Sequence, residues 1–312
     1  MTFAEAATRV HTENAPAWKN KKQRAQWIDS LKRFVFPTLG KRPVNHICSG
    51  DIIQVLTPIW LAKPETARRV RQRMRAVFDW AKAMGHYEGD NPVDGVIKVM
   101  PKQPARQKHH AAVPYAEAPA FVCAMREGDS DAATKLAFEF LILTAARTGE
   151  VLGACWDEID LEDAVWTVPA DRMKAGRAHR VPLSDRALEI LKKAAEHRDG
   201  AECVFAGKQG RPLSNMALLM TLRRMGVAAT VHGFRSAFRD WAAERTNFPR
   251  EVCERALAHT IKNKSEAAYR RGDMLDKRRK LMDAWSRFVR SDKAAIIPFK
   301  HSAHAQAAGG SR

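Results

Sequence analysis

Residues 230–241 read TVHGFRSAFRDW, and this stretch decides how the rest of the chain is interpreted. His232, Arg235 and Arg239 recur at intervals of three and four, which predicts one side of a helix. Three large aromatic residues fill another side, where they suit a protein core. The polar side is typical of an anion pocket, because arginine can bind two phosphate oxygens at once and histidine can exchange a proton near neutral pH. Many surface helices carry such a pattern, so other segments must support it.

Upstream, residues 140–152 read FLILTAARTGEVL. The apolar run 136–143 predicts a helix that ends shortly before Arg147, and Thr148 is expected to cap a second helix. Glu150 follows Arg147 by three residues, near enough to orient its guanidinium group. An ordinary structural salt bridge is the alternative interpretation of this pair.

Downstream, residues 256–271 read ALAHTIKNKSEAAYRR. His259 follows a short apolar run, and Tyr269 comes ten residues later beside two arginines. The other two tyrosines of the chain stand near predicted helix ends and are expected to be structural. Tyr269 is either a core tyrosine with a hydrogen-bonded hydroxyl or a nucleophile among cationic groups.

A basic hairpin is predicted between these motifs. The segments 164–169 (AVWTVP) and 179–183 (HRVPL) favour short strands, and residues 174–177 (KAGR) predict the turn that joins them. Lys174 therefore stands on the turn of this hairpin. The rest of residues 115–290 shows mostly helical periodicity, so the sequence predicts a helical domain with one small sheet.

The first hundred residues also show helical periodicity, over 18–36, 49–56 and 64–84. The last of these segments has an apolar side and an arginine-rich side with few acids. An arginine-rich side is either a solvated surface or a phosphate-contacting one, and the basic charge favours contact with DNA. The residues expected to contact DNA are Arg68, Arg69, Arg71, Arg73, Arg75 and Arg239.

The composition narrows the class of partner. A formal net charge of +18 indicates a polyanion, either nucleic acid or an anionic membrane surface. The chain has no apolar run long enough to span a membrane and no secretory signal. It also lacks nucleotide-binding glycine motifs and zinc motifs, and its five scattered cysteines argue against a disulfide framework. We therefore expect no metal, no other cofactor and no membrane, and a reducing cytoplasm.

Six residues suited to phosphate or proton chemistry follow one another along the chain: Arg147, Lys174, His232, Arg235, His259 and Tyr269. This order resembles the catalytic signature of the tyrosine recombinases, or phage integrases. The segments ARTGEV, HGFRSAFRDWAAE and ALAHTIKNKSEAAYRRGD are most similar to those of the P4-like prophage integrases. The resemblance covers residues 113–290 strongly and residues 1–104 more weakly.

The resemblance implies a mainly α-helical fold and a two-domain clamp on DNA. The expected parts are a helical core-type DNA-binding domain over 1–104, a linker over 105–112, a catalytic domain with a small β-sheet over 113–290 and a poorly ordered tail over 291–312. Helix 276–290 is expected to pack either on its own catalytic domain or on a neighbouring subunit.

The resemblance also implies a mechanism that needs neither metal nor ATP. Tyr269 attacks a DNA phosphate and forms a 3′-phosphotyrosyl bond. Arg147 and Arg235 clamp the phosphate, and His259 donates a hydrogen bond to it. His232 is expected to accept the proton of the tyrosine or to bind the phosphate.

Two further roles follow from the same resemblance. Lys174 is the expected general acid for the leaving 5′-oxygen, although Lys192, Lys193 and Lys208 remain alternatives. Glu150 is expected to support the pocket by orienting Arg147 or His232.

The chain departs from the family at several points. The interval from His259 to Tyr269 is slightly longer than in the commonest members, although it fits the P4-like form. Ala145 and Ala258 stand where many members have glycine. The small arm-binding domain that usually precedes the core-type domain finds no room before Trp18, which suggests a truncated gene or a start downstream of the full reading frame.

The implied partners are double-stranded DNA, three further copies of the chain in a homotetramer on DNA, and accessory DNA-bending or directionality factors. The implied location is the bacterial cytoplasm, at the nucleoid. Two other functions stay open: relaxation of DNA by a type IB topoisomerase, and DNA binding by a prophage remnant with impaired catalysis.

Overall fold

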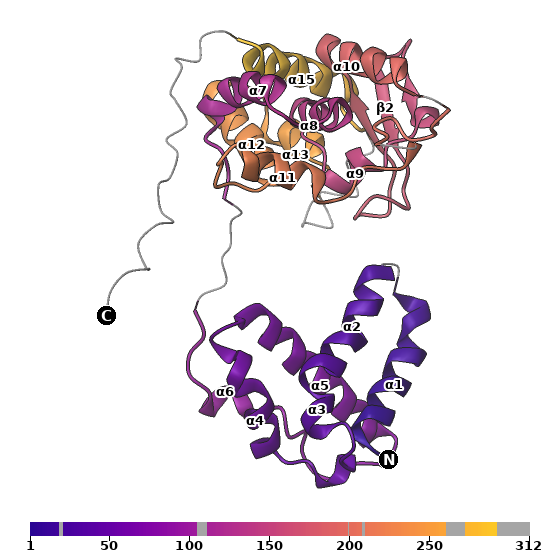
Figure 1. Ribbon diagram of the computed structural model, residues 1–312, viewed down its shortest axis with the longest axis vertical. Helices are drawn as coiled ribbons and strands as arrows, with labels where there is room; N and C mark the ends of the chain where they lie inside the picture. Colours follow the sequence, from indigo (N-terminus) through magenta and orange to yellow (C-terminus); the bar gives the residue numbers. More distant parts are fainter. Residues whose placement is uncertain (19–20, 105–110, 199, 208–209, 260–271, 292–312) are drawn as a thin grey trace, which may run out of the picture. The chain divides into compact units, whose positions relative to one another are not determined.

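The computed structural model describes residues 1–18, 21–104, 111–198, 200–207, 210–259 and 272–291. The chain divides into two compact units, residues 1–108 and 109–312, and each is described by itself. Both units are mainly helical, and the second contains a small antiparallel sheet, so the predicted fold class is confirmed (Figure 1). No helix among the described residues is long and apolar enough to cross a membrane.

The helices of the first unit enclose one apolar core, which includes Phe3, Leu56 and Phe78. The rings of Phe3 in the first helix and Phe78 in the longest helix are 5.6 Å apart between centroids. The elements are α1 (Phe3–Asn14), η1 (Ala15–Ala17), α2 (Lys21–Phe34), α3 (Phe36–Leu39), η2 (Val44–His46), α4 (Ser49–Trp60), α5 (Pro64–Ala83) and α6 (Val96–Val99).

Local signals explain where these helices begin. Glu5 and Thr2 form a reciprocal capping box at α1, in which Thr2 N donates to the Glu5 carboxylate at 2.8 Å. At α4, Asp51 accepts from the amide of Cys48 at 2.9 Å. Pro64 occupies the first turn of α5, where a missing N–H has no cost. The helix starts predicted at residues 49 and 64 are therefore confirmed.

The arginine-rich side of α5 is engaged within its own unit. Arg69 pairs with Glu65 at 3.1 Å, and Arg73 donates to the carbonyl of Gln26 at 2.8 Å. Arg75 pairs at 3.1 Å with a carboxylate from the loop that follows the helix. These partners offset part of the positive charge on this side, so its contact with DNA stays a prediction.

The second unit is arranged around α8, a helix that is buried on nearly all sides and packs against α7, α10 and α15 (Figure 1). Its elements are η3 (Tyr115–Glu117), α7 (Ala118–Glu127), α8 (Ala132–Thr144), α9 (Thr148–Leu152), η4 (Trp156–Glu158), β1 (Ile159–Asp160), β2 (Val165–Val168), β3 (His179–Pro182), α10 (Asp185–Glu196), α11 (Ala217–Arg224), α12 (Gly233–Arg245), α13 (Arg250–Ala256) and α15 (Leu275–Val289).

The sheet has the order β1-β2-β3 and is antiparallel throughout. In its central pair, Trp166 lies opposite Val181, and both side chains are buried in the core of the unit. The two predicted strands and the turn between them are confirmed. Strand β1 was not predicted, because two residues are too few to show an alternation of apolar and polar side chains.

Helix α15 packs into the core of its own unit. The indole Nε1 of Trp285 donates to the carbonyl of Ile142 in α8 at 2.8 Å, and the side chain is fully buried. Its ring centroid lies 5.0 Å from that of Trp241 and 5.5 Å from that of Phe238, both in α12. The first of the two packing alternatives for this helix is therefore the observed one.

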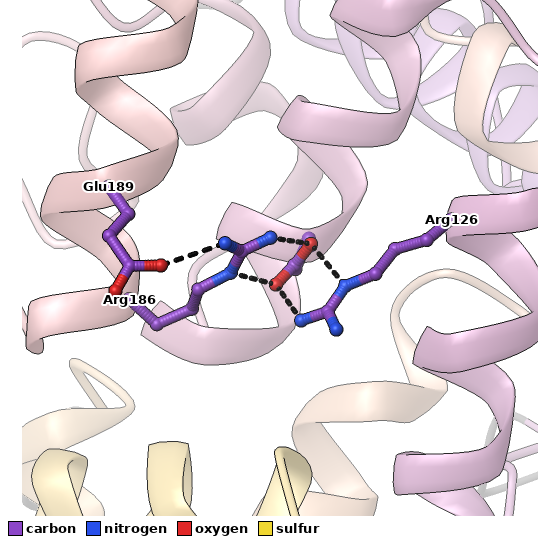
Figure 2. A network of polar contacts seen from close by, with 4 residues as sticks. Arg126, Arg186 and Glu189 are labelled. Atoms are coloured by element: carbon purple, nitrogen blue, oxygen red, sulfur yellow. Dashed lines mark hydrogen bonds and ion pairs between the residues drawn. The ribbon is translucent and has the colours of Figure 1, made fainter.

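A buried carboxylate joins three helices of this core (Figure 2). Glu139 in α8 is 3% exposed and accepts two hydrogen bonds from Arg126 in α7 and two from Arg186 in α10, between 2.5 and 3.1 Å. Arg186 also pairs with Glu189 at 2.8 Å. Burial opposes the charge, but the arginine hydrogen bonds outweigh it and hold the pKa of Glu139 below its ordinary value.

We expect Glu139→Gln to lower the free energy of unfolding by about 3 kcal/mol, because two partly buried guanidinium groups would lose their shared counter-charge. Urea unfolding at neutral pH measures this loss. The folded pKa lies below the ordinary value of 4.5, so the stabilisation is present above about pH 4.5 and is lost as the pH falls through the folded pKa.

The matched control is Glu189→Gln, which makes the same exchange at a side chain that is 46% exposed. Its expected cost is below about 1 kcal/mol, since water replaces the exposed partner. Equal costs for the two variants would contradict the assignment of Glu139 as the centre of the network.

Candidate active site

Arg235 is a buried arginine in the first turn of α12, with 4% of its surface exposed. Its Nη1 donates to the carbonyl of Ala145 and its Nη2 donates to the carbonyl of Leu257 at 2.6 Å. Gly233 allows the helix to start here, because a Cβ at this position would collide with the carbonyl of Ala111. The guanidinium is thus held between the ends of α8 and α13.

Arg147 stands at the start of α9 and reaches the same place. Its main-chain N donates to Glu150 Oε2 at 2.8 Å, its Nη1 donates to Glu150 Oε1 at 2.6 Å and its Nη2 donates to the carbonyl of Ala258 at 3.4 Å. Glu150 is only 4% exposed, so a buried carboxylate holds both the main chain and the guanidinium of Arg147 in place. The prediction that Thr148 caps this helix is wrong: Arg147 occupies the cap position, and the carboxylate of Glu150 satisfies its amide.

Two left-handed residues form the turns that carry these carbonyl groups. Ala145 and Ala258 both have a φ of 48°, in the region that favours glycine. Ala145 ends α8 and Ala258 follows α13, and their carbonyls accept from Arg235 and Arg147, respectively. The backbone conformation explains why glycine suits both positions, and alanine tolerates it at a modest cost.

The two guanidinium groups share one buried counter-charge. Burial and, to a smaller extent, the neighbouring charge of Arg147 lower the pKa of Arg235 to about 10, while Glu150 opposes the shift. Arg235 stays charged at neutral pH. The cluster of Arg147, Arg235 and Glu150 therefore carries a net positive charge in a partly dry environment, where an anion would be bound strongly.

His259 lies directly after the turn at Ala258. Its Nδ1 is 2.6 Å from Glu254 Oε2, and Glu254 Oε1 accepts from Arg239 Nε at 2.8 Å. Burial raises the pKa of Glu254, but its hydrogen bonds with Arg239 and His259 outweigh burial and leave the pKa below its ordinary value. With Nδ1 engaged by this carboxylate, Nε2 is the ring atom that a ligand of His259 would meet.

The structure thus brings together four of the predicted site residues: Arg147, Glu150, Arg235 and His259 converge around residues 257–259. Arg239, which was predicted to contact DNA, instead bonds to Glu254 beside them. Its contact with DNA stays a prediction.

Two of the other predicted residues lie at the surface, and one of them, His232, adjoins the cluster through its carbonyl, which accepts from the main-chain N of Arg235 at 3.1 Å. His232 is exposed immediately before α12, and Lys174 is exposed between β2 and β3. Among the described residues, no hydrogen bond or ion pair joins Lys174 to the cluster. Lys192 and Lys193 are exposed on α10, whereas Lys208 and Tyr269 lie outside the described residues.

Two residues near the cluster were not predicted. Arg278 in α15 is 1% exposed, and its Nη1 donates to the carbonyl of Arg180 at 2.6 Å while its Nε donates to the carbonyl of Asp273 at 2.7 Å. It ties the start of α15 to β3. His179 in β3 is the other one: burial lowers its pKa to about 4, and the charge of Arg278 contributes. Its place as the first residue of the β-favouring segment HRVPL was the only sequence signal for it.

We expect the stability of the protein to fall as His179 becomes protonated. The folded pKa of about 4 lies below the ordinary value of 6.5, so the unfolded chain binds the proton first. The contribution of neutral His179 is present above about pH 6.5 and is lost as the pH falls toward 4. Urea unfolding at about pH 7, 6 and 5 should give a flatter pH dependence for His179→Gln than for the parent.

His197→Gln is the control, because His197 is exposed at the end of α10. This variant should keep the slope of the parent. Parallel pH profiles for the parent and His179→Gln would show that the ring of His179 does not titrate in the expected way.

One group of side chains in the described part of the chain has metal-ligand spacing: Cys155, Asp157 and Glu158 place ligand atoms within 4.8 Å of one another. Glu158, however, already accepts from Arg172 Nη2 and from the indole of Trp166 at 3.0 Å. Arginine as an immediate neighbour opposes a bound cation. These residues therefore do not suit a metal.

Comparisons with known proteins agree with the two-unit fold and with the cluster of arginines described above. Residues 3–96 match the phage integrase central domain, and residues 113–274 match the phage integrase family. Prophage integrase IntA of Escherichia coli K12 is 31% identical over 309 residues, which are 95% of this chain and 74% of IntA. The integrase of Enterobacteria phage P4 is 26% identical over 316 residues, which cover 95% of this chain and 71% of that protein.

A solved structure of a lambda integrase tetramer bound to a Holliday junction shares the fold, with a TM-score of 0.67, 20% identity and coverage of 86% of this chain and 77% of that one. The helical units, the three-stranded sheet and the paired arginines define an enzyme of the site-specific tyrosine recombinase class. The chain belongs to the phage integrase family.

Proposed function

We propose that this recombinase cleaves and rejoins duplex DNA through a 3′-phosphotyrosyl bond at Tyr269, with Arg147 and Arg235 as the phosphate clamp. The convergence of the two arginines is the observation that carries the proposal. They come from separate elements, α9 and α12, and both are held at the turn of residues 257–259 by hydrogen bonds to main-chain carbonyls. Ten residues beyond His259, the chain reaches Tyr269.

A phosphodiester bound to this cluster would balance the net positive charge of Arg147, Arg235 and Glu150. Arginine forks can bind both non-bridging oxygens, and they would stabilise the further charge that develops in the transition state. The same positive field favours the phenolate of a nearby tyrosine over the phenol. A catalytic step that relies on cationic side chains in this way uses no metal and keeps the phosphoester energy in the protein–DNA bond.

The remaining roles are assigned by position and chemistry. His259, braced by Glu254, would donate from Nε2 to a phosphate oxygen. His232 would take the proton of the tyrosine or bind the phosphate. Lys174, exposed on the connection between β2 and β3, would protonate the leaving 5′-oxygen, and its exposure allows it to reach DNA.

DNA and further copies of the chain are the proposed partners. The lambda integrase with which the chain shares its fold forms a tetramer on a Holliday junction. We infer the same assembly here, with residues 1–104 as a DNA-binding domain, residues 105–112 as a linker, residues 113–290 as the catalytic domain and residues 291–312 as a tail. Accessory DNA-bending or directionality factors and action at the bacterial nucleoid complete the proposal.

The test begins with DNA that the protein itself selects. Duplexes with a randomised central sequence are enriched by binding to the protein and then nicked near the centre, so that cleavage releases a short fragment and traps the intermediate. The protein is mixed with this DNA in EDTA without ATP and run on a denaturing gel. We expect a protein–DNA adduct. Binding without any adduct would favour the impaired DNA-binding remnant.

Supercoiled plasmid separates the recombinase from a topoisomerase. A type IB topoisomerase relaxes supercoils without paired sites, whereas a recombinase rejoins strands between two selected sites. Recombinant products from paired sites support the proposal, and efficient relaxation of a plasmid without such sites would contradict it.

A further inference from the structure

Two cysteines that are distant in sequence face each other in the second unit. Cys155 and Cys203 form an isolated antiparallel bridge. The amide of the residue after each cysteine donates to the carbonyl of the residue before the other, at 3.1 and 2.8 Å. Hydrogen bonds that flank a pair in this way define the non-hydrogen-bonded antiparallel position, where Cα atoms are about 4.5 Å apart and both side chains lie on one face.

This position satisfies the geometric requirement for a disulfide, which needs Cα atoms about 4.4–6.8 Å apart and Cβ atoms that point toward each other. Both thiols are free and partly buried. Cys123 and Cys253, the other cysteines of this unit, are exposed and buried, respectively, and neither takes part in a bridge with another cysteine in the described residues.

We propose that Cys155 and Cys203 are a modification site at which a small-molecule disulfide or peroxide oxidises the two thiols to a reversible disulfide. With glutathione disulfide, the thiolate of one cysteine attacks a sulfur and releases one glutathione thiolate. The second cysteine then attacks the mixed disulfide and releases the other glutathione. The protein loses two electrons and two protons, and glutathione disulfide is reduced to two thiols.

The surroundings of Cys155 set the rate of this reaction. Burial raises the pKa of the Cys155 thiol, and the neighbouring Cys203 raises it further. Because the thiolate is the reactive form, oxidation should be slow at neutral pH and should accelerate as the pH rises. A thiol pair of this kind stays reduced in a reducing compartment and closes under oxidative conditions.

The disulfide would fix the position of the segment that begins at Cys155, and this segment is connected to the arginine cluster. Cys155 comes shortly after α9, whose Glu150 braces Arg147, and Arg172 links the carbonyl of Glu150 to the carboxylate of Glu158. A bond from Cys155 to Cys203 would fix this segment to its neighbour in the arrangement it already has. It would therefore stabilise the unit by restricting the unfolded chain, and leave the arginine cluster in place.

The experiment uses the full chain with glutathione disulfide as the oxidant. Peptide mapping without reduction is expected to show the peptide of Cys155 joined to the peptide of Cys203, with the joined pair two hydrogens lighter than the two separate peptides together. The Tm should rise by about 5 °C or more on oxidation, and a reductant should reverse both changes. Oxidation should be several times faster at about pH 8.5 than at about pH 7.

Cys155→Ser and Cys203→Ser should each abolish the oxidised gain in Tm, and Cys123→Ser, at an exposed and unbridged cysteine, should keep it. Mapping of the unaltered chain needs no variant, so the test does not depend on how the variants fold. Cysteine pairs other than Cys155 with Cys203, stable mixed disulfides on both residues, or continued reaction of Cys155 and Cys203 themselves with a maleimide after oxidation would overturn the proposal. None of these readouts requires recombinase activity.

Discussion

Tyr269→Phe is expected to abolish covalent capture of DNA, with a loss of ~10,000-fold or more, while the Kd for DNA changes by less than about twofold. The exchange removes one oxygen, the proposed nucleophile, and keeps the ring and the neighbouring arginines. Phosphate binding by Arg147 and Arg235 does not use that oxygen, so binding and cleavage should separate. Adduct formation on the selected nicked DNA and a filter-binding titration measure the two quantities.

Tyr115→Phe is the matched control. Its hydroxyl donates to Glu244 at 2.8 Å on the surface of the same unit. This variant should form the adduct at a rate within about twofold of the parent. Adduct formation by Tyr269→Phe at an appreciable rate would move the nucleophile to another residue.

Arg235→Lys is expected to slow strand cleavage ~1,000-fold with little loss of DNA binding, because only the fork of arginine can bond to two carbonyls and still present N–H groups to phosphate. A lysine amine cannot span the carbonyls of Ala145 and Leu257, which Arg235 joins across the unit. Single-turnover cleavage measures the effect, and thermal unfolding shows how far the variant is destabilised.

The same exchange at Arg245, an exposed arginine at the end of α12, provides the control. Arg245→Lys should cleave within about twofold of the parent. If Arg235→Lys retained parental single-turnover rates, the arginine would be a scaffold for the turn at residues 257–259 and no part of the phosphate clamp.

Much of the fold follows from periodicity in the sequence. The long apolar stripe after Pro64 predicted α5, and the β-favouring segments on either side of residues 174–177 predicted β2 and β3. The family was recognised from the order of the motifs, and the comparisons confirm it. The prediction that Thr148 caps its helix was wrong. The carboxylate of Glu150 accepts from the amide of Arg147, three residues earlier in the chain, and the cap position therefore falls on Arg147, one residue before Thr148.

The candidate site was only partly predictable, because its geometry depends on contacts between distant segments. The sequence indicated that Arg147 and Arg235 belong together, but it gave no sign that both donate to main-chain carbonyls at residues 257 and 258. The brace of His259 by Glu254, and the burial of Arg278 and His179, also arise from packing. Periodicity within one segment carries no information on such pairs.

Ala145 and Ala258 illustrate the difference between what the sequence indicates and what the structure shows. In the sequence they were departures from a glycine pattern, and in the structure they are left-handed turns whose carbonyls meet the two arginines. The pairing of Cys155 with Cys203 was likewise invisible, because their spacing in sequence resembles no disulfide or metal motif and only the hydrogen-bond register places them face to face.

The central claim, that Tyr269 forms the covalent bond to DNA, is tested most directly by locating that bond. The adduct formed in EDTA on the selected DNA is digested with trypsin and nuclease, and the remaining nucleotide is located by mass spectrometry. We predict that the nucleotide is attached to Tyr269 in the tryptic peptide of residues 265–270, SEAAYR. A nucleotide on any other peptide, or an adduct that forms only with added metal, would contradict the account.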